Sequence, residues 1–240
     1  MRYLIVLLIL ASASIFTSDA QQQTYKATHL SLPEGLSQSS VMDIVQDSKG
    51  FIWMSTQDGL NRYDGTEFKV FREEPFDSTS ISSNNLNPLH VDSKGRLWIG
   101  TINHGLNLYL ENSDQFLHFK SSESKKSISG NLITDITEDR SGSLWVGTAT
   151  GLNRLIETTN EKGNIDYSFE FIQLINADHD SSGWNHIIDI YYANDNKLWV
   201  ATREGLVFID LNNSLLPNPS IKYFAAADDY SGNFVWEVIG

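Results

Sequence analysis

Residues 92–106 read DSKGRLWIGTINHGL, and the same pattern occurs three more times in the chain. Residues 47–60 read DSKGFIWMSTQDGL, residues 139–152 read DRSGSLWVGTATGL, and residues 193–206 read ANDNKLWVATREGL. In the complete copies an Asp is followed three residues later by a Gly, then by a Trp, a Thr and a Gly-Leu pair. The tryptophans recur every 45 to 54 residues, a spacing that indicates a repeat architecture.

One copy of the repeat predicts four short strands. In the first copy, runs rich in β-branched and aromatic residues lie at residues 41–46, 51–55, 60–63 and 67–71. Asp47 and Gly50 stand where a type I turn prefers these residue types. Asp64-Gly65 is a strong hairpin signal. Four antiparallel strands in one repeat of this length form one blade of a β-propeller.

The predicted fold class is therefore all-β, a β-propeller of four-stranded antiparallel blades in an incomplete ring. Blades are expected at about residues 41–83, 84–130, 131–184 and 185–232, with part of a fifth at 233–240. Within residues 21–40, the segment from Tyr25 to Leu30 is expected to be a closing outer strand. Because four whole blades and the first strand of a fifth leave exposed strand edges, we expect this chain to be the N-terminal part of a longer protein.

The recurrent motif residues are interpreted as structural. Each Trp is expected to pack between neighbouring blades, and a small residue two positions later should leave room for the next blade. In the fourth copy Asn196 replaces Gly, and the turn should survive because Asn tolerates a left-handed backbone. The structural set is Asp47, Gly50, Trp53, Gly59, Asp92, Gly95, Trp98, Gly105, Asp139, Gly142, Trp145, Gly151, Trp199 and Gly205.

The N-terminus predicts export. Arg2 precedes an apolar run at residues 4–10, and Ser18-Asp19-Ala20 is a small-x-small cleavage site. This pattern is typical of a signal peptide covering residues 1–20, and the run is too short to span a bilayer. The chain has no cysteine, which excludes a disulfide scaffold and a thiolate metal site. Its net charge of −13 argues against nucleic-acid binding, which needs a basic surface.

No catalytic or metal constellation can be singled out. The six histidines show no metal-ligand spacing, and no phosphate-binding Gly-rich loop or Gly-x-Ser-x-Gly motif occurs. Asp178, His179 and Asp180 are compatible with a cation site, but a solvated loop is the simpler interpretation. Neither a metal nor a cofactor is expected in this chain.

The motif copies resemble the two-component regulator propeller repeat. The opening segment, residues 29–41, and Gly59-Leu60-Asn61-Arg62-Tyr63-Asp64-Gly65 are similar to the periplasmic sensor region of hybrid two-component histidine kinases of Bacteroidetes type. The resemblance covers residues 25–240. It implies two seven-bladed propellers, then an immunoglobulin-like domain, a membrane helix and a cytoplasmic kinase. It also implies a homodimeric receptor, attached to the inner membrane, that senses oligosaccharide or polysaccharide fragments and controls polysaccharide-utilisation genes.

Blade geometry points to one candidate ligand face. The turn between the second and third strands lies at the same end of a blade as the link into the next blade. On this face Trp184 stands where the other links carry Gln38, Ser83 and Gly130. An aromatic ring suits stacking on a sugar, and neighbouring polar groups could bond its hydroxyls. The candidate ligand residues are Trp184, Asn185, His186, Asn103, His104 and Arg203. Alternatively, Trp184 fills a gap in its long loop.

The leading expectation is a non-catalytic sensor propeller of a histidine kinase that transmits ligand binding mechanically. Double substitution of Trp184 and His186 by Ala should then abolish ligand binding while the fold survives. The alternative is a secreted propeller that binds carbohydrate or protein without a kinase. A propeller lyase or hydrolase is a third option, for which the sequence shows no assigned catalytic residue.

Overall fold

The protein is an all-β array of four sheets. The computed structural model describes residues 27–174, 182–193, 195–212 and 220–224. Each sheet has four antiparallel strands, paired in the order in which they occur in the chain. This confirms the predicted fold class. The predicted signal peptide, Asp178 to Asp180 and the start of a fifth blade lie outside the described residues.

Each sheet is called a blade here and corresponds to one copy of the repeat. Blade one contains β1 (Val41–Gln46), β2 (Ile52–Thr56), β3 (Gly59–Tyr63) and β4 (Phe68–Phe71). Blade two contains β5 (Leu86–Val91), β6 (Leu97–Thr101), β7 (Leu106–Leu110) and β8 (Gln115–Phe119). Blade three contains β9 (Ile133–Glu138), β10 (Leu144–Thr148), β11 (Gly151–Thr159) and β12 (Ile165–Ile172). Blade four contains β13 (Ile187–Ala193), β14 (Lys197–Thr202), β15 (Gly205–Asp210) and β16 (Ile221–Phe224).

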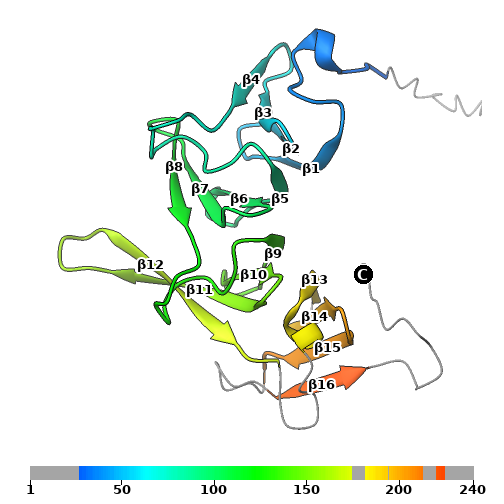
Figure 1. Ribbon diagram of the computed structural model, residues 1–240, viewed down its shortest axis with the longest axis vertical. Helices are drawn as coiled ribbons and strands as arrows, with labels where there is room; N and C mark the ends of the chain where they lie inside the picture. The colour runs from blue at the N-terminus through cyan, green and yellow to red at the C-terminus, as the bar shows by residue number, and fades with distance from the viewer. Residues whose placement is uncertain (1–26, 175–181, 194, 213–219, 225–240) are drawn as a thin grey trace, which may run out of the picture.

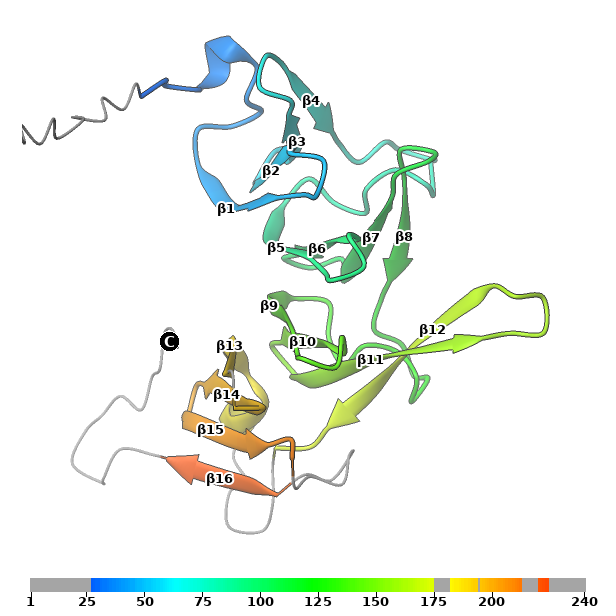
Figure 2. The same ribbon diagram turned by 180° about the vertical axis from the view of Figure 1, so that it is seen from behind.

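The blades are arranged side by side in an open arc (Figures 1 and 2). The first strands β1, β5, β9 and β13 line the inner side of the arc, and each contacts the next. The fourth strands lie on the outer side (Figure 1). Two short 3-10 helices, η1 (Leu32–Glu34) and η2 (Ser182–Asn185), belong to links that precede blades one and four. Residues 27–30, the described part of the expected closing strand, are irregular.

An Asp in the first strand fastens one blade to the next. The Leu89 backbone N–H of blade two donates to the Asp43 carboxylate of blade one at 2.7 Å, and Ile190 donates to Asp135 at 2.7 Å. Both acids lie where the pairing of the first and second strands shifts register, because a bulge turns the side chain toward the neighbouring blade. Blade two has Pro88 at this position, and there the Asn87 amide donates to the Ile133 carbonyl at 3.0 Å.

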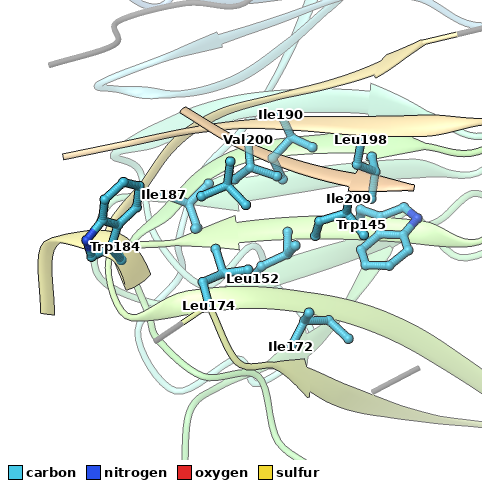
Figure 3. Close-up of a cluster of buried hydrophobic side chains, with 11 residues drawn as sticks. Trp145, Leu152, Ile172, Leu174, Trp184, Ile187, Ile190, Leu198, Val200 and Ile209 are labelled. Carbon is cyan, nitrogen blue, oxygen red and sulfur yellow. The ribbon is translucent and has the colours of Figure 1, made fainter. Parts of the chain in front are cut away.

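The core lies between the blades, in three clusters of buried apolar side chains. Trp53, Trp98 and Trp145 are at most 2% exposed, which confirms that the motif tryptophans pack between blades. Gly147, two residues after Trp145, confirms the predicted need for a small side chain. A Cβ built there would lie 2.7 Å from Ile187 of the next blade. Figure 3 shows the cluster between blades three and four.

Blade three departs from its neighbours in its outer hairpin. β11 has nine residues and β12 has eight, whereas the third and fourth strands of the other blades have four to six. The sequence predicts the outer strand of this copy around residues 169–172, but β12 begins at Ile165. The extra length makes this hairpin project outward from the arc (Figures 1 and 2).

Candidate functional site

The motif Asp fastens its own turn to the motif Trp. In blade three, Asp139 Oδ1 accepts the backbone N–H groups of Ser141 and Ser143, and Asp139 Oδ2 accepts the Trp145 indole N–H at 2.8 Å. Asp47 and Asp92 hold Trp53 and Trp98 in the same way, also at 2.8 Å. A buried indole N–H needs such a partner. The Asp is therefore a structural residue, and its bond to Trp is a role that turn preference alone did not reveal.

The fourth copy keeps the turn without this Asp. Ala193 stands at the Asp position, and the Asn196 N–H still donates to the Ala193 carbonyl at 3.1 Å. Asn196 has a φ of 64°, in the same left-handed region as Gly50, Gly95 and Gly142. This confirms that Asn can replace the motif Gly. Trp199, on the last described blade, is only half-buried.

A second set of hydrogen bonds, unforeseen from the sequence, holds the incoming link to its blade in blades one, two and three. In blade two the Ser82 N–H donates to Asn107 Oδ1, and the Asn107 amide donates back to Ser82 Oγ, each at 3.0 Å. Ser129 and Asn153 make the same reciprocal pair, as do Ser37 and Asn61. The recurring Leu-Asn in the motif is the sequence signal for this clamp. Blade four carries Val207 at the Asn position.

The structure places the predicted ligand residue Trp184 in the core. Its side chain is 5% exposed and belongs to the cluster between blades three and four. It lies at one end of that cluster, with Trp145 at the other (Figure 3), and its ring meets Tyr223 edge-on at 5.1 Å. A stacking platform must present an open ring face, so this burial agrees with the gap-filling interpretation. The same burial conflicts with the expectation that the fold tolerates Trp184→Ala.

Three other candidates lie beside Trp184 on blade four. The Arg203 N–H donates to the His186 carbonyl at 3.2 Å, which joins the link to the turn between β14 and β15. Asn185 Oδ1 accepts the Leu174 N–H at 3.4 Å, so this amide is partly used in holding the link. Burial lowers the pKa of His186, and the positive charge of Arg203 lowers that pKa further. His186 is therefore a neutral donor and acceptor near neutral pH.

Asn103 and His104 lie on blade two, in the exposed turn between β6 and β7. The His104 N–H donates to Thr101 Oγ1 at 2.8 Å, which leaves both side chains facing solvent. Blade three stands between this turn and the Arg203 turn. Ligand binding by the six candidate residues remains a prediction. Their exposed side chains belong to two separate turns and do not form one compact group.

Two carboxyl groups meet on the inner side of the arc. Asp135 on β9 is hydrogen-bonded to Asp189 on β13. Burial of Asp135 and the neighbouring charge of Asp189 raise the pKa of Asp135 to about 7. Such a pair shares a proton near neutral pH. Since Asp135 also accepts the backbone bond from blade four, this pair belongs to the junction between blades.

The described residues contain no group of three or more His, Cys, Asp or Glu side chains arranged to hold a metal ion. Among those same residues, none of the helices has the length and apolar character that a bilayer-crossing segment needs.

Comparison with known proteins identifies the repeat. Residues 35–58, 80–103 and 127–150 match the family model described as "two component regulator propeller". A stretch of 74 residues is 47% identical to histidine kinase P4 of Formosa agariphila, and it makes up 31% of this chain but only 5% of that protein. The chain thus matches a small part of this curated relative.

Two solved structures are similar to this chain, and the one with a TM-score above 0.5 supports the fold. The chain is similar to PorZ, a surface component of the type-IX secretion system of Porphyromonas gingivalis, with a TM-score of 0.57 and 15% identity over 83% of this chain and 29% of that chain. It is also similar to the extracellular domain of a putative hybrid two-component system of Bacteroides thetaiotaomicron, with a TM-score of 0.48 and 23% identity over 87% of this chain and 38% of that one.

Proposed function

Because this chain carries three repeats of the two-component regulator propeller family, we propose that it is part of the ligand-sensing propeller of a membrane-attached hybrid histidine kinase. The observation that carries the proposal is the order and spacing of these repeats, together with the 47% identity of one stretch to a histidine kinase. The propeller senses, and a kinase elsewhere in the complete protein supplies the phosphoryl chemistry.

The proposed ligand is an oligosaccharide released from a polysaccharide, and the proposed output is control of polysaccharide-utilisation genes. The proposed location is the periplasm, reached through the N-terminal export signal. A net charge of −13 favours a neutral ligand over a polyanion. Ligand binding changes the dimer and shifts a two-state signalling assembly across the membrane.

We call the end of the blades that carries the links and the turns between second and third strands the link face. On it, the exposed side chains Asn103, His104 and Arg203 are the proposed ligand contacts, and Trp184 supports this face from within the core. The triple variant Asn103→Ala, His104→Ala, Arg203→Ala changes exposed side chains and should leave the fold intact. It therefore replaces Trp184→Ala as a probe of binding, since truncating a buried Trp costs about 3–5 kcal/mol.

The deciding experiment uses the complete gene in its own bacterium. Transcripts of polysaccharide-utilisation genes are measured on a panel of purified glycans, with the gene intact, deleted, or replaced by the triple variant. We expect one glycan to induce transcripts in cells with the intact gene, and we expect deletion to abolish this induction. Equal induction with and without the gene would contradict the sensor function. Induction lost on deletion but retained in the triple variant would contradict only the assignment of the link face.

The second candidate is a secreted propeller that binds carbohydrate without a kinase. Reading the gene beyond residue 240 separates the two. A membrane span followed by a kinase supports the sensor, whereas a stop codon after one closed ring supports the secreted module.

A further inference from the structure

A hollow of about 470 Å³ lies at the end of the blades opposite the link face. It is bounded by the first turn of blade one (residues 47–49), the first turn and following strand of blade two (residues 94–97), and β7 with its following turn (residues 108–113). Tyr167 on the projecting hairpin of blade three completes it. This volume falls within the roughly 300–1,000 Å³ typical of small-molecule sites. We call it the blade-two hollow.

Departures from the repeat converge on this hollow. Blade two has Leu108 where blades one and three have Arg62 and Arg154. In blade one the Arg62 guanidinium lies over the Phe51 ring at 4.7 Å and over the Trp53 ring at 5.6 Å. Blade two exchanges the two residue types: Arg96 stands at the Phe51 position and lies over the Trp98 ring at 5.2 Å, and Leu108 stands at the Arg62 position.

Another departure is the extended β11–β12 hairpin. It brings Tyr167 to the hollow and places Glu157 against Arg96 and Lys94, and only blade three has such an extension among the described blades. In a repeat protein, exceptions that gather at one place point to function, because the fold alone does not require them.

The charged groups around the hollow are fixed in pairs. Arg96 donates to Asp92 at 2.7 Å and to Glu157 at 2.6 Å, and Lys94 donates to the second Glu157 oxygen at 2.7 Å. Burial raises the pKa of Glu157, but hydrogen bonds from Arg96 and Lys94 outweigh it and lower that pKa. At the rim, Lys49 pairs with Glu111. Each cation thus stands beside an anion.

Such a lining suits a ligand whose polar groups both donate and accept. A sugar hydroxyl does both, so it can bond to Lys or Arg donors and to Glu acceptors at the same time. A charged ligand would meet a like charge in each pair. The half-buried Leu110 adds apolar surface for the C–H groups of a sugar ring.

We propose that the blade-two hollow binds a neutral, hydroxyl-rich small molecule, of the size of roughly one or two sugar rings. The choice of a carbohydrate rests on the proposed function, whereas the position of the site rests on the structure. Lys49 and Glu111 at the exposed rim contact the ligand hydroxyls. Arg96 and Tyr167 form the inner wall, and Glu157 holds Arg96 in place.

The test is calorimetric titration of the 240-residue chain with neutral disaccharides (cellobiose, maltose, xylobiose and laminaribiose) and with digalacturonate as the charged probe. The double variant Lys49→Ala, Glu111→Ala removes an exposed ion pair and should weaken binding of the neutral disaccharide at least tenfold. Its matched control is Asp58→Ala, Arg72→Ala, an exposed ion pair at 2.9 Å near the link face. The control should bind as the wild type does.

A second variant obstructs the hollow. Ser113→Trp places a bulky ring at an exposed position of the lining, so the fold should accommodate it. It should weaken binding at least tenfold at equal thermal stability. Unchanged binding in both hollow variants would overturn the site. Binding of digalacturonate but of no neutral disaccharide would overturn the ligand class, and binding of none of these probes would overturn the proposal.

This outcome is separable from that of the sensor proposal. Glycan-dependent transcription that persists in cells carrying Lys49→Ala, Glu111→Ala would overturn a role of the hollow in sensing and leave the sensor function standing.

Discussion

At the residue scale, the repeat is maintained by two polar side chains that hold backbone and aromatic groups in place. The motif Asp accepts hydrogen bonds from backbone N–H groups of its own turn and from the buried indole N–H of the motif Trp. The Asn after Gly-Leu clamps the incoming link through a Ser. The turn role of Asp was predictable from local preference. Both longer bonds depend on where the folded chain places residues that are six to twenty-five positions apart.

Asp139→Ala should lower the free energy of unfolding by about 1–3 kcal/mol, because it leaves the buried Trp145 indole N–H without its acceptor. Urea unfolding followed by tryptophan fluorescence measures this loss. Glu123→Ala, an exposed acid in a link, is the control and should change stability by less than about 0.5 kcal/mol. An unchanged urea midpoint for Asp139→Ala would contradict the structural role of the bond.

The carboxyl pair predicts a pH dependence of stability. Asp135 has a pKa of about 7 in the folded protein, because burial and Asp189 raise it, whereas an unfolded Asp has a pKa of about 3.9. Between these values the folded state holds a proton that the unfolded state has lost. The contribution of this pair to the free energy of unfolding therefore falls as the pH rises from about 4 to about 7, and it then levels off.

Asp189→Asn should reduce that pH-dependent component, since the charge of Asp189 no longer raises the pKa of Asp135 and burial alone does. Asp43→Asn is the matched control, because Asp43 makes the same bond to the next blade but faces Pro88 in place of an acid. Urea midpoints measured from pH 5 to pH 8 compare the variants. A wild-type pH profile in Asp189→Asn would show that the two carboxyl groups titrate independently.

At the element scale, strand positions followed closely from the sequence, but the links and the projecting hairpin did not. β1 begins and ends where the run at residues 41–46 predicted, because turn residues bound that run. The early start of β12 was missed, since residues 160–164 read as a loop and only pairing with β11 extends the strand through residues 165–168.

The Asn–Ser clamp is predicted to control the order of a whole link. Asn107→Val imitates Val207 of blade four and removes both hydrogen bonds between Asn107 and Ser82. Amide hydrogen exchange in residues 81–86 should then accelerate at least tenfold, while exchange in β1 and β2 stays unchanged. Equal acceleration throughout the chain would show global destabilisation and contradict a local clamp.

At the scale of the whole molecule, apolar packing between blades is the main source of stability, and the inner strand of blade one has an exposed apolar face. Val41 and Ile44 of β1 are 40% and 60% exposed, whereas Ile133 and Ile136, at the equivalent positions of β9, are 0% and 5% exposed. The sequence predicted the blades because each copy is local. It could not place the ligand residues, since the burial of Trp184 depends on how its loop folds against blade three.

This difference predicts unequal effects of matched substitutions. Ile136→Asp should destabilise the chain strongly, because it buries a charge without a partner between blades two and three. Ile44→Asp places the charge on an exposed surface and should change the melting temperature little. Differential scanning calorimetry compares them, and equal losses would show that the face of β1 is covered in solution.

The fourth blade has Ala193 at the position of the motif Asp and Val207 at the position of the clamping Asn. The two ends of the array therefore differ. When a pulling force acts on a row of similar units, the unit with the fewest stabilising hydrogen bonds unfolds first. Here that unit stands at one end of the described row. Under such a force, blade four should therefore unfold before the other three blades.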